Sequence, residues 1–239
     1  RQGNPAVQRA RRTLLEQCDL IYASTAVLSD RYSRLFPQKK IFSGIYAPYL
    51  DFLLSQKPAS AKQPFTIGYM GSKGHQADLE TIVPAISLLL ERHPTVRFET
   101  FGTIAMPKAL MGLGNRTQSH QTDTDYAGFL NKLAQLGWGI GLAPLNNTEF
   151  NRCKAPTKYI EYTTCGIPTI ASSGQVYDQF TSESQILIAR PDEWAAKMQQ
   201  LIDSEPLRAS LVANGQAYCA QVFSLNALEA QIKELIAQV

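Results

Sequence analysis

Apolar residues fall into short continuous runs separated by longer stretches of helical spacing, and this alternation becomes regular from Phe65 onward. The pattern predicts strands at Phe65–Met70, Thr95–Phe101, Asn115–His120, Gly139–Ala143, Thr169–Ser172 and Ile186–Ala189. It predicts helices at Ala77–Arg92, Pro107–Leu113, Asp125–Leu136, Ala155–Cys165, Asp192–Ser204, Pro206–Val222 and Leu225–Ala237. Strands alternating with helices of this length predict an α/β fold, a Rossmann-like parallel sheet with helices on both faces.

The first 60 residues carry a shorter version of the same pattern. Expected elements are a helix at Ala6–Gln17, a strand at Asp19–Ser24, a helix capped by Thr25 that ends near Phe36, and a strand at Lys40–Ile45. A loop at Ala47–Phe52 and a linker-like stretch at Gln56–Pro64 follow. The sequence therefore predicts two units, residues 1–60 and residues 61–239.

Composition narrows the class of protein. The formal charge of +3 over 239 residues comes from scattered basic residues, without the basic and aromatic pattern of a nucleic-acid binder. Four cysteines stand far apart, with no spacing suited to zinc, and predict reduced thiols in a cytosolic protein, although a disulfide stays an alternative. No apolar run approaches the roughly 20 residues that span a bilayer. The abrupt basic start suggests an excerpt from a longer chain.

Residues 139–172 contain the strongest candidate site. A buried strand leads through the loop Pro144–Cys153 into the helix Ala155–Cys165, with Pro156 in its first turn. Gly166 suits the positive φ that often follows a helix, and Pro168 prevents continuation. A helix N-terminus that opens from such a loop presents free N–H groups and attracts phosphate.

The polar side chains of this helix support the same interpretation. Lys154, Lys158 and Glu161 are spaced i, i+4 and i+7, which predicts that they share one helix face. Two lysines could neutralise a diphosphate, and Glu161 could accept hydrogen bonds from a ribose diol. The alternative is a solvated face on which Glu161 pairs with one of the lysines.

A second candidate site follows the strand Phe65–Met70, in the stretch GSKGHQADLE. Its glycines, Gly71 and Gly74, allow close approach of a ligand to the backbone. Its polar residues are Ser72, Lys73 and His75 in the loop and Asp78 in the first helical turn. The alternative is an ordinary glycine-rich turn in which His75 only caps its own loop. Both candidate loops leave the carboxyl ends of parallel strands, so we expect them to form one pocket.

Two further strand ends lie where this pocket is expected. Gly102–Ala105 is predicted to line the part of it that holds a base, and His120 either stacks there or is structural. Tyr162, in contrast, is predicted to be a core residue.

Residues 143–172 resemble the signature of retaining glycosyltransferases with two Rossmann-like domains, the GT-B architecture, of the family 4 or group 1 type. Matching positions are Pro144, Leu145, Phe150, Asn151, Lys154, Lys158, Glu161, Tyr162, Gly166 and Pro168. Asn147, Ala155 and Thr164 depart from the pattern. In the wider family two glutamates are spaced by seven residues; Glu161 matches the second, but Cys153 occupies the first position, whose role therefore cannot be transferred.

The loop after Met70 resembles the same branch. Its matching positions are Ile67, Gly68, Tyr69, Met70, Gly71, His75, Asp78 and Leu79. The resemblance implies that residues 1–60 are the tail of an acceptor-side domain plus a linker, and that residues 61–239 form the donor-binding domain, the C-terminal half of the architecture. It implies catalytic roles for Lys154, Lys158 and Glu161. The implied donor-binding residues are Gly71, Ser72, Lys73, His75, Asp78, Phe150, Asn151 and Glu161.

The function implied is transfer of a sugar, with retention, from a nucleotide-diphospho-sugar to a glycan or lipid-linked acceptor in polysaccharide assembly. No metal or other cofactor is expected, since lysines and a helix N-terminus can stabilise the departing diphosphate. The alternatives are a nucleotide-sugar binding module without independent catalysis and a nucleotide-sugar epimerase of the same architecture. We expect a cytoplasmic protein, with peripheral contact to the inner face of a membrane through the missing domain as a further option.

Overall fold

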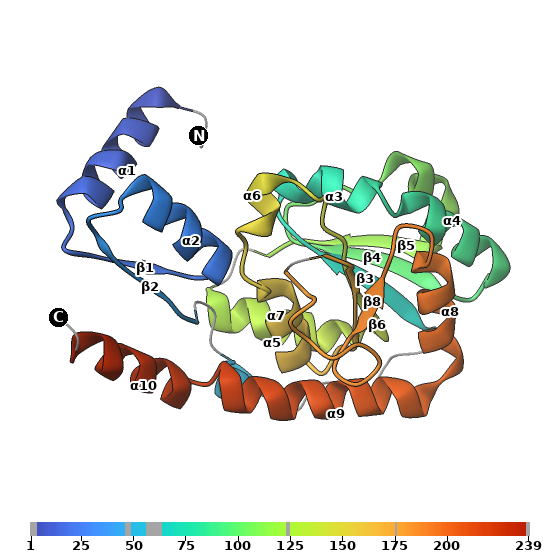
Figure 1. The fold of residues 1–239 in the computed structure, drawn as a ribbon. Coiled ribbons are helices and arrows are strands. Elements are labelled where there is room, and N and C mark those ends of the chain that lie inside the picture. The colour runs from blue at the N-terminus through green and yellow to red at the C-terminus, as the bar shows by residue number, and fades with distance from the viewer. Residues whose placement is uncertain (1–3, 46–48, 56–63, 123–124, 175, 238–239) are drawn as a thin grey trace.

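A computed structural model describes residues 4–45, 49–55, 64–122, 125–174 and 176–237 of the chain (Figure 1). The strands are β1 (Leu20–Ala23), β2 (Lys40–Ser43), β3 (Thr66–Met70), β4 (Arg97–Phe101), β5 (Thr117–His120), β6 (Ile140–Ala143), β7 (Thr169–Ser172) and β8 (Leu187–Ala189). The α-helices are α1 (Pro5–Gln17), α2 (Ala26–Leu35), α3 (Gln76–Glu80), α4 (Val83–Arg92), α5 (Tyr126–Leu136), α6 (Glu149–Arg152), α7 (Thr157–Thr164), α8 (Trp194–Asp203), α9 (Glu205–Val222) and α10 (Leu225–Ile236). Short 3₁₀ segments occur at Asp51–Leu53, Lys73–His75 and Lys108–Arg116.

The strands form two separate parallel sheets. The larger one has the order β5-β4-β3-β6-β7-β8, and β1 pairs with β2 in the smaller one. The chain therefore winds outward from β3 in one direction and from β6 in the other, so that neighbouring loops diverge between these two central strands. The predicted Rossmann-like parallel sheet is confirmed.

Helices cover both faces of the large sheet (Figure 1). Side chains alternate between faces along each strand, so Ile67 and Tyr69 join one apolar cluster with α3, α4 and α8, while Met70 joins another with α5, α7 and α9. Each cluster contains residues that are almost fully buried, including Ile86 in the first and Leu133 in the second. The core thus consists of two layers separated by the sheet.

At the centre of the sheet, glycines leave the face toward α7 without strand side chains. Gly68 of β3 and Gly141 of β6 are paired in register. A Cβ atom would lie 1.8 Å from the ring of Trp138 at position 68 and 2.8 Å from that of Tyr162 at position 141. The Tyr162 hydroxyl accepts a hydrogen bond from the Met70 N–H (2.9 Å) and donates one to the Leu142 carbonyl (3.1 Å). Tyr162 is fully buried, as predicted, and its hydroxyl ties α7 to β3 and β6.

Several predicted boundaries were wrong for identifiable reasons. The predicted helix Ala77–Arg92 is two helices, α3 and α4, with Pro84 in the first turn of α4. Within a continuous helix, this proline would lack an N–H donor and its ring would clash with the preceding turn. The predicted loop Pro144–Cys153 contains α6, which Thr148 caps through a hydrogen bond from the Asn151 N–H.

The N-terminal unit, α1-β1-α2-β2, lies beside α10 and the main body of the molecule (Figure 1). Gln231 of α10 accepts hydrogen bonds from the Tyr22 hydroxyl and the Ile45 N–H, each 3.0 Å long. The predicted linker Gln56–Pro64 falls outside the described residues except for Pro64, and assignment of residues 1–60 to an acceptor-side domain stays a prediction. In the described part of the chain, no helix combines the length and apolar character needed to cross a membrane.

The close contact between Gly68 and the Trp138 ring leads to a prediction about stability. Gly68→Ala forces a methyl group into the Trp138 ring, so we expect the free energy of unfolding to fall by about 3 kcal/mol. Gly112→Ala is the control because nothing lies within 4 Å of its added Cβ, and we expect a change within about 0.5 kcal/mol. Urea unfolding followed by tryptophan fluorescence measures both. Equal stability of the two variants would show that the contact between Trp138 and the sheet is dispensable.

Candidate active site

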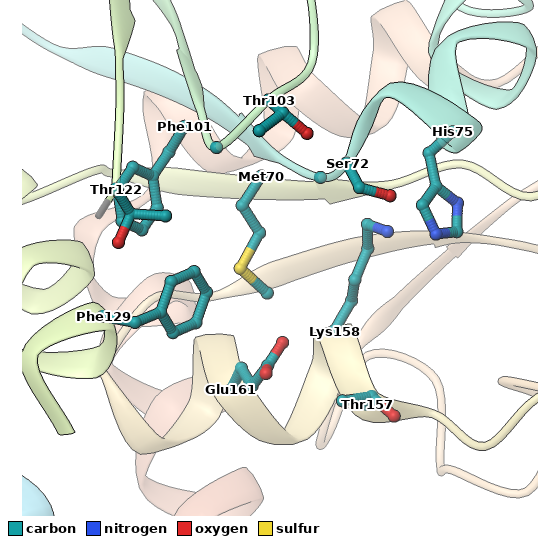
Figure 2. A pocket seen from close by; sticks show the side chains of 12 residues that line it. Met70, Ser72, His75, Phe101, Thr103, Thr122, Phe129, Thr157, Lys158 and Glu161 are labelled. Atoms are coloured by element: carbon teal, nitrogen blue, oxygen red, sulfur yellow. The ribbon is translucent and has the colours of Figure 1, made fainter. Parts of the chain in front are cut away.

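A cavity of about 390 Å³ opens at the carboxyl edge of the large sheet (Figure 2). Its lining comes from the ends of β3 and β4 and the loops after them, from the segment after β5, from α5 and from α7. The lining residues are Met70, Gly71, Ser72, His75, Phe101, Gly102, Thr103, Thr122, Phe129, Thr157, Lys158 and Glu161. The two stretches that the sequence singled out therefore form walls of one cavity. Among the predicted site residues, Gly71, Ser72, His75, Lys158 and Glu161 lie there.

One wall of the cavity is formed by the loops after β3 and β4, and backbone hydrogen bonds hold these two loops together. The Gly71 N–H donates to the Phe101 carbonyl (2.9 Å), and the Gly71 carbonyl accepts from the Ile104 N–H (3.1 Å). Gly102 has a φ of +106°, and a Cβ there would lie 2.6 Å from the Gly71 oxygen. Only glycine fits this close approach at positive φ. Gly102 and Thr103 line the cavity, but their predicted contact with a base stays a prediction.

The opposite wall of the cavity is the first turn of α7. Its N-cap residue, Pro156, supplies no side-chain cap, so the first N–H groups of the helix are available to an anion. Lys158 projects from this turn toward the Gly71–His75 loop (Figure 2), and its ammonium lies 5.4 Å from the centre of the Tyr69 ring. Burial lowers the pKa of Lys158 to about 8, although the nearby Glu161 carboxylate acts to raise it.

Glu161 lies about one turn further along α7 and also faces the cavity (Figure 2). Burial raises the pKa of its carboxyl group to about 7. The Tyr126 hydroxyl donates a hydrogen bond to Glu161 Oε1 (3.0 Å), which acts in the opposite direction by favouring the carboxylate. A half-buried carboxylate whose pKa is displaced in a cleft is typical of a functional site.

The end of the cavity opposite His75 is aromatic (Figure 2). The rings of Phe101 and Phe129 are stacked with centroids 5.0 Å apart, and Tyr126 stacks on Phe129 at 5.9 Å. Sequence reasoning did not single out Tyr126 or Phe129. The available signal was their i, i+3 spacing in the predicted helix Asp125–Leu136, the next element after the predicted strand Asn115–His120.

A second cavity, of about 310 Å³, adjoins the first and shares His75, Thr157 and Lys158 with it. Lys154 lies here, together with Ser24 from the N-terminal unit and with Ala155. The prediction that Lys154 shares a helix face with Lys158 was wrong. Lys154 precedes α7, because the helix begins only after Pro156. Burial lowers the pKa of Lys154, partly offset by the charge of Asp78.

Asp78 lines neither cavity. It is 5% exposed, and its oxygens meet His75 Nδ1 (3.0 Å), the Asn146 N–H (2.9 Å) and the Asn151 side-chain amide (3.2 Å). Burial acts to raise the pKa of Asp78, but the hydrogen bonds from His75 and Asn146 hold it below its ordinary value. Asp78 therefore joins α3 to the loop after β6 and orients His75, and Asn151 is occupied in the same network.

The remaining predicted residues lie outside these cavities. Lys73 is exposed, and so is Phe150, whose ring lies 5.2 Å from the Lys154 ammonium. His120 Nε2 lies 2.9 Å from Glu99 Oε2, which also accepts from the Trp138 indole N–H, so His120 has a structural partner.

The sequence predicted reduced cysteines and a site without a metal ion. All four cysteines are free thiols. Within the described residues, no cluster of three or more His, Cys, Asp or Glu side chains could hold a metal ion. The expectation of a metal-free site stays a prediction.

The parallel sheet and the cavity at its carboxyl edge define a protein of the Rossmann-like class, in which ligands bind at this edge. The family model described as "Glycosyl transferase-like" matches residues 84–236, well over half of the chain. This chain therefore belongs to the glycosyl transferase-like family. Among curated proteins, none matches the sequence significantly.

Solved GT-B glycosyltransferase structures share the fold. Anabaena HepE, in complex with UDP and glucose, has a TM-score of 0.71 at 12% identity over 98% of this chain and 67% of that chain. S. aureus TarM, in complex with Fondaparinux, α-GlcNAc-glycerol and UDP, has a TM-score of 0.67 at 11% identity over 94% and 46%. The pneumococcal O-GlcNAc transferase GtfA, in complex with UDP and GlcNAc, has a TM-score of 0.67 at 14% identity over 93% and 46%. This chain thus spans about two thirds of the length of HepE and less than half of that of TarM and GtfA.

The pKa of Glu161 predicts how stability depends on pH. The folded pKa of about 7 exceeds the ordinary value of 4.5 for a glutamate, so between these two pH values the folded state holds more protons than the unfolded state. The contribution to stability is complete below pH 4.5 and is lost as pH rises through 7. Glu161→Gln removes this loss, so we expect the variant to exceed the wild type by up to about 3 kcal/mol at pH 8.

Urea unfolding at a series of pH values from 5 to 8 measures this difference. Glu91→Gln, at an exposed position of α4, is the matched control and should follow the wild-type pH profile. If Glu161→Gln also follows that profile, burial does not displace the titration of Glu161.

Proposed function

We propose that this chain carries the donor site of a retaining group 1 glycosyltransferase and binds a nucleotide-diphospho-sugar in the two adjoining cavities. The observation that carries the proposal is the convergence of Lys158, Glu161 and the Gly71–Ser72 loop on one cavity at the carboxyl edge of the sheet. Membership of the glycosyl transferase-like family supports it. The fold is also that of structures solved with UDP, so UDP is the first nucleotide to test.

The two ends of the first cavity suit different parts of a nucleotide. The base lies toward Phe101 and Phe129, where aromatic side chains offer apolar surface. Glu161 accepts hydrogen bonds from the ribose hydroxyls. The diphosphate lies between Lys158 and the Gly71–Ser72 backbone, on the uncapped N-terminus of α7.

The donor sugar extends into the second cavity, beside His75 and Lys154. During transfer the bond between the anomeric carbon and the diphosphate oxygen breaks, and the electron pair leaves with the nucleoside diphosphate. Lys154, Lys158 and the helix N-terminus meet this negative charge where it develops. The acceptor hydroxyl forms the new bond to the anomeric carbon and gives its proton to the departing diphosphate oxygen. Retention of configuration rests on the family resemblance.

Glu161→Ala tests the nucleotide assignment. We expect UDP affinity to fall about tenfold or more, because the ribose loses a charged hydrogen-bond acceptor worth about 1.5–3 kcal/mol. Lys158→Ala should weaken UDP binding by a similar factor through the lost phosphate contact. Calorimetric titration measures both variants. Glu91→Ala and Lys233→Ala, at exposed positions of α4 and α10, are matched controls. Unchanged UDP affinity in Glu161→Ala and Lys158→Ala would refute the assignment.

Tyr162→Phe tests whether nucleotide binding depends on the anchoring of α7. The variant leaves the Met70 N–H and the Leu142 carbonyl without their bridge, and we expect a loss of about 1–3 kcal/mol in unfolding free energy. UDP affinity, measured in the same calorimetric assay, should also fall, because α7 carries Lys158 and Glu161. Normal UDP affinity in a destabilised Tyr162→Phe protein would separate the anchor from the site.

The alternative activities differ in their products. A transferase releases free sugar slowly from a nucleotide-sugar when no acceptor is present, whereas an epimerase inverts the C2 centre and keeps the sugar attached. Incubation with UDP-sugars and analysis of the products distinguishes these outcomes. Nucleotide binding without either product would favour a binding module.

A further inference from the structure

The second cavity is built from both units of the chain. Ser24, at the carboxyl end of β1 in the N-terminal unit, lines it together with Lys154, His75 and Lys158. The next residue, Thr25, crosses the boundary between the units, since its hydroxyl donates a hydrogen bond to the Cys153 carbonyl (3.1 Å). The same hydroxyl accepts from the Leu28 N–H (3.2 Å) and so caps α2.

The Thr25 contact falls on the peptide group directly before Lys154. Lys154 is outside α7, and its own N–H bonds to the Asn151 carbonyl (3.1 Å) at the end of α6. A second tie joins the same segments: Arg31 of α2 forms an ion pair with Glu149 of α6 (2.5 Å). The stretch that carries Lys154 is therefore fixed on one side by α6 and on the other by α2.

We propose that Thr25 is a positioning residue for Lys154, so that the N-terminal unit sets where this lysine meets the phosphate next to the sugar. The inference rests on the proposed function, because it takes Lys154 as a contact of the diphosphate. Lys158 differs, since α7 is anchored to the sheet through Tyr162. Loss of the Thr25 contact therefore affects the distal phosphate and leaves the nucleoside end of the site intact.

The test compares UDP with UMP, which lacks the distal phosphate, in the full chain. Lys154→Ala is expected to lower UDP affinity about tenfold, the loss of one charged hydrogen bond, with UMP affinity nearly unchanged. Thr25→Val, which can neither donate nor accept, is expected to lower the ratio of UDP to UMP affinity by about three- to tenfold. Thr25→Ser keeps the hydroxyl and should restore the wild-type ratio.

Two controls separate positioning from loss of stability. Ser204→Ala removes an N-cap hydrogen bond of the same length (3.2 Å) from α9 and should leave the affinity ratio unchanged. In the Lys154→Ala background, Thr25→Val should lower the ratio little further, because its effect passes through the lysine.

The proposal is overturned if Thr25→Val keeps the wild-type ratio while Lys154→Ala lowers it, or if the two losses simply add. It is also overturned if Lys154→Ala leaves the ratio unchanged. In that case weakened UDP and UMP binding by Glu161→Ala would still support the nucleotide site, so failure of the inference is distinguishable from failure of the proposed function.

Discussion

The hydroxyl group of Tyr162 is the contact on which the arrangement of the site depends. It satisfies the Met70 N–H and the Leu142 carbonyl, two buried backbone groups that the pairing of β3 with β6 does not reach. Unpaired, each group would carry a desolvation cost of about 1–3 kcal/mol. The Tyr162 ring can lie close to the strand backbone because Gly141 has no side chain, and Gly68 leaves room for the neighbouring Trp138 ring in the same way. With the Tyr162 hydroxyl bonded to both strands, Lys158 and Glu161 on the same helix face the cavity.

The electrostatics of this helix follow from its burial. Lys158 and Glu161 are spaced i, i+3, and burial displaces the pKa of each toward its neutral form, to about 8 and about 7. Burying either charge is unfavourable unless a partner offsets the cost. A diphosphate beside Lys158 would stabilise the ammonium and raise its pKa, while ribose hydroxyls donating to Glu161 would favour the carboxylate. A bound nucleotide would thus add to the partners that Glu161 and Lys158 already have in Tyr126 and in each other.

Hydrophobic periodicity was sufficient to predict the strands and most helices, because each strand alternates between two apolar layers and each helix packs one face. The helix break between α3 and α4 is explained by Pro84. The prediction missed this break because the helical spacing of the apolar residues was given more weight than the proline. For Lys154, the helical spacing was misleading, since Lys154 lies in the non-helical connection between α6 and α7. Asp78 was placed in the correct region, but its burial depends on partners 68 and 73 residues away, Asn146 and Asn151, which no local pattern reveals.

The two lysines differ in how the fold holds them. Lys158 belongs to a helix that is bonded to the central strands, so its position follows the large sheet alone. Lys154 lies on a connecting segment bonded to α2 through Thr25 and Cys153, so its position also follows the N-terminal unit. A rotation of one unit against the other would shift Lys154 relative to Lys158 while leaving Glu161 and the aromatic end unchanged. In the proposed donor site, the nucleoside would therefore contact the unit of the large sheet alone, whereas the leaving diphosphate would also depend, through Lys154, on the N-terminal unit.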